Sequence, residues 1–171
     1  LIVSINTGAY MAESVRGGII SIDPGQTEGA KAIGMNVIAF DIFHIPGIEE
    51  ELGIPYVEMD ELLAKSDFIS VHAPAVDGGA LINAERIAKM KDGVVIINTS
   101  RGTNVDEAAL LDALNSGKVR AAGLDVYADE PATNVALYSH PMVSCTPHIG
   151  SATVEAQGRI GEELVEIISK M

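Results

Sequence analysis

Short apolar runs alternate along this chain with segments whose apolar residues recur at helical spacing. This alternation is typical of βαβ units, in which parallel strands are joined by helices, and it disfavours hairpins. It predicts an α/β fold with a doubly wound, Rossmann-like parallel sheet of about six strands. The strands are expected at Gly18–Ile22, Asn36–Phe40, Phe68–His72, Val94–Asn98, Ala121–Asp125 and Met142–Cys145.

Helix boundaries are marked by residues that satisfy the free backbone groups of a helix end. Helices are expected at Asp60–Lys65, at Asn83–Met90 with Asn83 as N-cap, and at Asp106–Ser116 with Gly117 following its last residue. The segment Thr153–Met171 repeats apolar residues at helical spacing, so it predicts a long amphipathic C-terminal helix. Its apolar stripe comprises Ala156, Ile160, Leu164, Ile167 and Ile168.

Composition limits the partners and the number of domains. The 171 residues contain 24 acidic and 11 basic side chains, a formal charge of −13, which argues against nucleic acid as a partner. No apolar run approaches the roughly 18 residues of a membrane span, and the single Cys145 fits a reducing compartment. We therefore expect a cytoplasmic protein without membrane contact. No linker or repeat divides the chain, so residues 1–171 are expected to form a single domain.

Three chemically versatile residues each follow an apolar run. Arg101, Glu130 and His148 lie in the strings Asn-Thr-Ser-Arg-Gly, Asp-Glu-Pro and Thr-Pro-His-Ile-Gly. Taken singly, each reads more simply as an ordinary loop residue. Because the carboxyl ends of parallel strands meet at one sheet edge, however, the three together predict an acid/base and anion-binding site there.

Longer motifs give the chain a specific resemblance over about Gly34 to Gly161. In order, they are Glu61-Leu-Leu-Ala-Lys-Ser-Asp67, Phe68-Ile-Ser-Val-His72-Ala-Pro74, Leu81-Ile-Asn-Ala-Glu85, Met90-Lys-Asp-Gly93, Ile97-Asn-Thr-Ser-Arg101-Gly, Gly123-Leu-Asp125-Val and Thr146-Pro-His148-Ile-Gly150. The chain resembles the NAD-binding domain of the D-isomer-specific 2-hydroxyacid dehydrogenases, and Thr153-Val-Glu-Ala-Gln157 is most similar to their D-3-phosphoglycerate dehydrogenase branch. Residues 1–33 are atypical, and the substrate domain of that family has no evident counterpart.

The resemblance implies a role for each of the three residues. His148 would exchange a proton with the substrate oxygen while a hydride moves between substrate and NAD. Glu130 would fix the imidazole tautomer and favour the imidazolium. Arg101 would hold the substrate carboxylate through a two-pronged ion pair. The implied reaction is NAD-dependent oxidoreduction of a 2-hydroxy or 2-keto acid, with 3-phosphoglycerate as the leading substrate.

Cofactor contacts are expected along the same sheet edge. Asp41 directly follows an apolar run, where its carboxylate can accept hydrogen bonds from both ribose hydroxyls and repel a 2′-phosphate, which favours NAD over NADP. By resemblance, His72 covers the adenine or its ribose, and Asp125 contacts the nicotinamide carboxamide. The full set is Asp41, His72, Ala73, Pro74, Thr99, Ser100, Asp125 and Gly150. No histidine, cysteine or carboxylate spacing indicates a metal site.

The expected glycine-rich turn that cradles a diphosphate is missing after Gly18–Ile22. The segment Ser21–Gly29 has wrongly spaced glycines, a proline and two carboxylates. Either this turn is remodelled and dinucleotide affinity is weakened, or the chain joins segments across absent residues; both interpretations stay open.

Two other functions also stay open. One is a dinucleotide-sensing binding module, as in the transcriptional corepressors related to this family; the other is a non-catalytic nucleotide-binding fragment. The apolar stripe of the last helix and the N-terminal Leu-Ile-Val segment lack an obvious internal partner, so a homodimer is expected.

Overall fold

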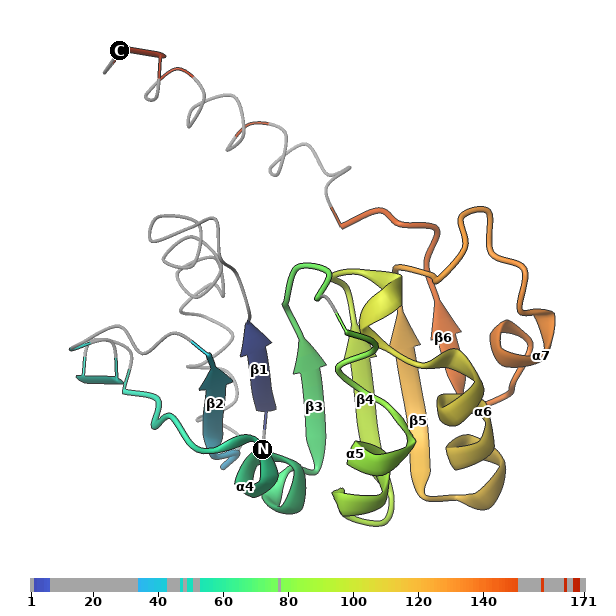
Figure 1. The fold of residues 1–171 in the computed structure, drawn as a ribbon, viewed down its shortest axis with the longest axis horizontal. Helices are drawn as coiled ribbons and strands as arrows, with labels where there is room; N and C mark the ends of the chain where they lie inside the picture. The colour runs from blue at the N-terminus through green and yellow to red at the C-terminus, as the bar shows by residue number, and fades with distance from the viewer. Residues whose placement is uncertain are drawn as a thin grey trace.

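The structure is a computed structural model, and it describes residues 2–6, 34–42, 47, 49–50, 53–76, 78–150, 158, 165 and 168–169. At its centre is a six-stranded parallel sheet with the strand order β2-β1-β3-β4-β5-β6 (Figure 1). The strands are β1 (Ile2–Asn6), β2 (Val37–Asp41), β3 (Phe68–Val71), β4 (Val94–Asn98), β5 (Val119–Leu124) and β6 (Val143–Cys145).

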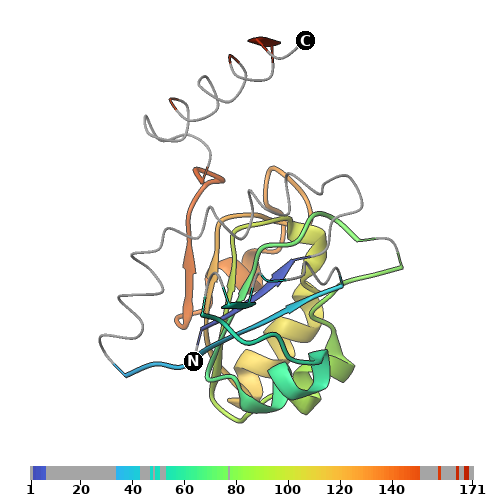
Figure 2. The same ribbon diagram turned by 90° about the vertical axis from the view of Figure 1, so that its left-hand side faces the viewer.

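The described helices connect successive strands. They are α4 (Met59–Lys65), α5 (Ala84–Lys89), α6 (Glu107–Ser116) and α7 (Val135–Tyr138), with a 3-10 turn, η1, at Gly102–Asn104. Helices α4, α5 and α6 pack side by side and cover one face of the sheet (Figures 1 and 2). Parallel strands joined in this way by helices give the Rossmann-like α/β fold that the sequence predicts.

Helix ends follow the capping residues closely. The Asn83 side chain accepts a hydrogen bond from the N–H of Arg86, 3.0 Å away, and so caps α5. Asp106 accepts from the N–H groups of Ala108 and Ala109, each at 3.1 Å, at the start of α6. Gly117 ends α6 in the left-handed conformation, with φ of 78°. These caps confirm the predicted ends of both helices.

The predicted strands are largely confirmed, with small shifts at their ends. The prediction for β4 matches in full, while β2, β3, β5 and β6 differ from the predicted ranges by one or two residues at an end. The short helix α7 and the turn η1 were not predicted, because each is less than two turns long and leaves no periodic pattern.

One strand of the sheet was not predicted. The predicted strand Gly18–Ile22 lies outside the described residues, and the strand that fills the sheet is β1, five residues long, at the start of the chain. It lies between β2 and β3, pairing Ile2 with Val37 and Ser4 with Ser70. The N-terminal segment therefore has internal partners, which removes one of the two reasons for expecting a dimer.

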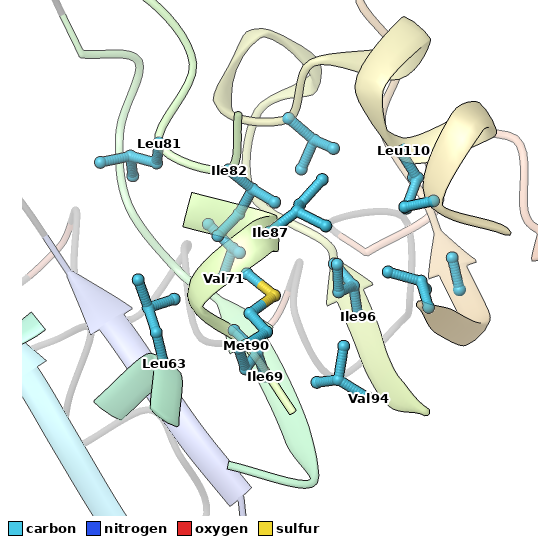
Figure 3. Packing of buried hydrophobic residues seen from close by; sticks show 14 of the residues in the cluster. Leu63, Ile69, Val71, Leu81, Ile82, Ile87, Met90, Val94, Ile96 and Leu110 are labelled. Carbon is cyan, nitrogen blue, oxygen red and sulfur yellow. The ribbon is translucent and has the colours of Figure 1, made fainter. Parts of the chain in front are cut away.

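Buried side chains of the sheet meet those of the helices in one continuous core (Figure 3). Ile69 and Val71 of β3 and Ile96 of β4 face Leu63 of α4 and Leu110 of α6, all fully buried. Removing such a side chain from water stabilises a fold by about 1.5–3 kcal/mol. This packing fixes the strands whose carboxyl ends carry the site residues.

The predicted helix Thr153–Met171 falls mainly outside the described residues, and only four of its positions are described, all helical. No helix within the described ranges has both the length and the apolar character needed to cross a membrane.

Candidate active site

The site lies at the carboxyl edge of the sheet. Strand order reverses at β1, which has β2 on one side and β3 on the other, and such a reversal opens a crevice outside the strand ends. All eight residues expected to contact the cofactor follow or end a strand at this edge. Asp41 ends β2, residues 72–74 follow β3, residues 99–100 follow β4, Asp125 follows β5, and Gly150 lies beyond β6.

Glu130 and His148, 18 residues apart in the chain, form a hydrogen-bonded pair. The His148 Nδ1 atom lies 2.9 Å and 3.0 Å from the two carboxylate oxygens of Glu130. The bond from His148 lowers the pKa of Glu130, against smaller raising effects of desolvation and of the Asp125 charge. Both side chains are more than 40% exposed, so the second ring nitrogen can reach a ligand. This arrangement suits an acid/base histidine whose orientation is set by a carboxylate.

Asp125 holds the turn that presents His148. One carboxylate oxygen accepts from the Thr146 hydroxyl and from the N–H of Ile149, and the other accepts from the N–H of Gly150. Burial alone would raise the pKa of Asp125, but these three hydrogen bonds outweigh it and the pKa is lowered. His148 is the only described non-glycine residue with positive φ, at 55°, so the clamp also holds an uncommon backbone conformation. The nicotinamide contact implied for Asp125 stays a prediction.

Arg101 follows β4 in a loop ordered by the buried side chain of Asn98. The Asn98 amide donates to the Arg101 carbonyl at 2.9 Å and accepts from the N–H and hydroxyl of Ser100 at 3.1 Å and 2.8 Å. The exposed Arg101 guanidinium donates to the Ser100 carbonyl at 2.7 Å. Among the described residues, Arg101 forms no hydrogen bond or ion pair with Glu130 or His148, so it shares their sheet edge but not their hydrogen-bond network.

The remaining cofactor positions differ in exposure. Asp41 is 2% exposed at the end of β2. His72 Nε2 lies 2.7 Å from the Ser70 hydroxyl, and desolvation by burial lowers the pKa of His72. Ala73 is buried and its carbonyl accepts from the Asn104 amide at 2.8 Å. Thr99 and Gly150 are exposed. A Cβ atom added to Gly150 would lie 3.1 Å from a carboxylate oxygen of Asp125.

A cavity of about 450 Å³ adjoins the Glu130 and His148 pair. Its walls include Tyr127, Tyr138 and Cys145, none of which the sequence analysis assigned to the site. The Tyr127 ring lies edge-on to Tyr138 with centroids 4.8 Å apart, and its hydroxyl donates to the Thr146 carbonyl. In the sequence, Tyr127 could have been noticed because it is an aromatic residue directly after the motif Gly123-Leu-Asp-Val.

No group of three or more histidine, cysteine or carboxylate side chains within the described part of the chain could hold a metal ion.

Comparison with known proteins gives a consistent result. Residues 25–150 match the model of the family described as D-isomer specific 2-hydroxyacid dehydrogenase, NAD binding domain. A D-3-phosphoglycerate dehydrogenase of Mycobacterium leprae is 48% identical over 147 residues, which cover 84% of this chain and 28% of the relative. A hydroxypyruvate reductase of Thermotoga maritima is 45% identical over 184 residues, covering 98% of this chain and 59% of the relative.

A solved structure extends the likeness to the fold. D-Lactate dehydrogenase from Aquifex aeolicus, complexed with NAD and lactic acid, has a TM-score of 0.73 and 34% identity, with 99% of this chain and 52% of the other covered. The chain thus spans between about a quarter and three fifths of the length of these three proteins.

Proposed function

The chain belongs to the D-isomer specific 2-hydroxyacid dehydrogenases, matching their NAD binding domain, and from this we propose that it supplies the cofactor-binding and acid/base parts of an NAD-dependent dehydrogenase. The reaction would interconvert a D-2-hydroxy acid and the corresponding 2-keto acid. The observation that carries the proposal is the hydrogen-bonded Glu130 and His148 pair, which follows β5 and β6 at the carboxyl edge of the parallel sheet.

The proposed chemistry assigns one task to each side chain. NAD, when bound, supplies or accepts the hydride at the substrate carbon. In reduction, His148 donates a proton to the carbonyl oxygen as it becomes the hydroxyl; in oxidation, His148 takes that proton back. Glu130 stabilises the protonated imidazole before the transfer. Arg101 binds the substrate carboxylate and draws electron density from the reacting carbonyl.

The described residues fit NAD in two respects. Asp41 ends β2 beside the point where strand order reverses, where a carboxylate would bind the ribose hydroxyls and exclude a 2′-phosphate. The ends of β3 and β4 bring residues 72–74 and 99–100 to the same edge. The segment Ser21–Gly29, which would meet the diphosphate, lies outside the described residues.

Several finer assignments belong to the proposal. Residues 1–171 would be one dinucleotide-binding domain, acting with a substrate domain, and the protein would be a cytoplasmic homodimer. The substrate would be a small 2-hydroxy acid or the corresponding 2-keto acid; the names of two relatives suggest 3-phosphoglycerate as the hydroxy acid and hydroxypyruvate as the keto acid. Light scattering at high concentration tests the dimer, and a monomer would contradict it.

The test is an NADH titration followed by a turnover assay. We expect saturable nicotinamide fluorescence with NADH and weaker binding of NADPH, then oxidation of NADH by hydroxypyruvate, glyoxylate or phosphohydroxypyruvate. A His148→Asn variant should keep NADH binding but lose about 10²- to 10⁴-fold in turnover, because it removes the proton donor. His140→Asn, at an exposed turn before β6, is the matched control and should retain the parent rate.

The two alternatives predict different results. A binding module would bind NADH and change its oligomeric state without reducing 2-keto acids. A non-catalytic nucleotide-binding fragment would bind NADH without reducing 2-keto acids and without changing its oligomeric state. Either result would contradict the proposed hydride transfer for this chain.

A further inference from the structure

Glu107, in the first turn of α6, makes three hydrogen bonds to the segment that carries Glu130. Its Oε1 atom accepts from the N–H of Ala128 at 2.9 Å and from the Tyr138 hydroxyl at 2.8 Å. Its Oε2 atom accepts from the amide of Asn134 at 3.1 Å. Ala128 precedes Glu130 in the chain, and Asn134 and Tyr138 follow it. One carboxylate therefore holds both ends of the loop formed by residues 128–134.

The peptide group between Tyr127 and Ala128, whose N–H donates to Glu107, also packs against the backbone of Gly102. A Cβ atom added to Gly102 would lie 1.8 Å from the Tyr127 carbonyl oxygen and 2.5 Å from the Ala128 nitrogen, closer than any real contact. The backbone of Gly102 therefore packs directly against this peptide. Because Gly102 directly follows Arg101, the loop that carries Arg101 touches the loop that carries Glu130.

From this peptide the structure leads directly to the acid/base pair. The bond to His148 lowers the pKa of Glu130, and the Tyr127 backbone adds to this effect. Glu130 itself follows Ala128 by two residues, so the peptide and the carboxylate belong to one short segment. The Tyr127 hydroxyl donates to the Thr146 carbonyl, two residues before His148. Movement of the Tyr127–Ala128 peptide would therefore disturb both members of the pair.

We propose that Glu107 is a positioning residue: by fixing the Tyr127–Ala128 peptide and the loop as far as Asn134, it sets the geometry in which Glu130 meets His148. The inference deepens the proposed function, and its catalytic consequence rests on that function. Desolvation by burial and the bond to Glu107 raise the pKa of Tyr138, so its hydroxyl stays a donor at neutral pH. Within the described part of the chain, Glu107 forms no hydrogen bond or ion pair with Glu130 or His148, so it acts on them through the loop.

The test compares Glu107→Ala with Glu85→Ala in the same chain. Glu85 is also an acidic residue in the first turn of a helix, α5, but it is largely exposed and forms an ion pair with Lys89 of its own helix. The two variants therefore remove the same charge and the same helix-end interaction, and only Glu107→Ala releases the loop. Glu107→Gln keeps one acceptor oxygen and serves as the conservative variant.

The first readout is titration of the Glu130 carboxyl by ¹³C NMR, with His148 and Asp125 as the neighbouring charges. In the parent and in Glu85→Ala, Glu130 should titrate below the ordinary glutamate value of about 4.3. In folded Glu107→Ala it should move toward that value as the bond to His148 weakens, with Glu107→Gln between the two. Should Glu107→Ala be unfolded, Tyr138→Phe, which deletes one donor, is titrated in its place. Unchanged titration in every folded loop variant would overturn the proposal.

Turnover is the second readout. Glu107→Ala should lower kcat by up to about 100-fold, as misplaced catalytic groups do, while the KM for NADH stays near the parent value. Parent-like kcat in folded Glu107→Ala would overturn the positioning role. A parent that neither binds NADH nor turns over would count against the proposed function, whereas the Glu130 titration would still decide the role of Glu107.

Discussion

The His148 turn depends on a single buried carboxylate. Asp125 is 5% exposed and accepts three hydrogen bonds from residues 146–150. In Asp125→Asn, the new amide would turn donor hydrogens toward backbone N–H groups and leave at least one of them unpaired. We expect a loss of about 1–3 kcal/mol in the free energy of unfolding, measured in urea. Asp112→Asn, an exposed change on α6, should leave stability unchanged, and an equal loss in both variants would contradict the clamp.

His72 should make stability depend on pH. Its burial lowers its pKa, so below the ordinary value of about 6.5 the unfolded chain takes up a proton that the folded protein does not. The free energy of unfolding should therefore be constant above that pH and fall as the pH decreases through it, until the folded pKa is reached. Thermal melts of His72→Gln should show a weaker dependence between pH 7 and pH 5. Identical profiles for parent and variant would count against this assignment.

Individual site residues were predictable from sequence to different degrees. The contact between Glu130 and His148 could be predicted, because strand-end residues converge on one edge of a parallel sheet. The roles assigned to these two residues and to Arg101 stay predictions. Glu107 could not, because its role depends on which loop folds over the start of α6, which no local pattern encodes. The resemblance pointed to Asp125 as a cofactor contact, but its hydrogen bonds to Thr146, Ile149 and Gly150 could not be predicted, because they depend on how the chain folds after β6.

At the scale of elements, α6 contacts both the loop that carries Glu130 and the hydrophobic core. Its N-terminal turn holds the loop with Glu130, while its buried Leu110 and Leu114 pack on the sheet. Helix α6 therefore links the loop that carries Glu130 to the hydrophobic core.

The C-terminal cap of α6 gives a clean test of backbone conformation. Gly117 has a φ of 78°, and an added Cβ would contact nothing within 4 Å. Gly117→Ala should thus cost about 1–2 kcal/mol of stability through backbone strain alone. Gly123→Ala in β5 is the control: there the Cβ would meet Ile97 at 3.9 Å, an ordinary contact, so stability should not fall. Equal losses in chemical denaturation would refute the strain argument.

Element prediction succeeded where physical signals are local. Capping residues and long apolar runs located α5, α6 and β4, because their ends and cores are determined within a few residues. It failed for β1, whose five residues become a strand only through pairing with β2 and β3, far along the chain. Short α7 depends in the same way on its neighbours, with Asn134 both capping it and bonding Glu107.

At the scale of the whole molecule, net charge should influence stability more than individual ion pairs do. The chain carries a formal charge of −13, while lysine ion pairs such as Lys91 with Asp67 and Lys65 with Glu61 are largely exposed. Exposed pairs contribute little, whereas repulsion among many like charges acts over the whole surface. Raising the ionic strength from about 0.01 M to 0.15 M should therefore raise Tm in chloride buffers. A falling Tm would mean that the ion pairs dominate.

The position of β1 also has a consequence for the order of events during synthesis. β1 leaves the ribosome before either of its neighbours, yet it lies between them in the finished sheet. Its pairing with β3 has to wait until Val71 has been made, 71 − 5 = 66 residues after Ile5. At about 5–20 residues per second, that wait is roughly 3–13 s. Once β2 has been made, β1 can pair with it, but the other edge of β1 stays without a strand partner until β3 follows. An apolar strand with an unpaired edge is a place where a nascent chain can aggregate.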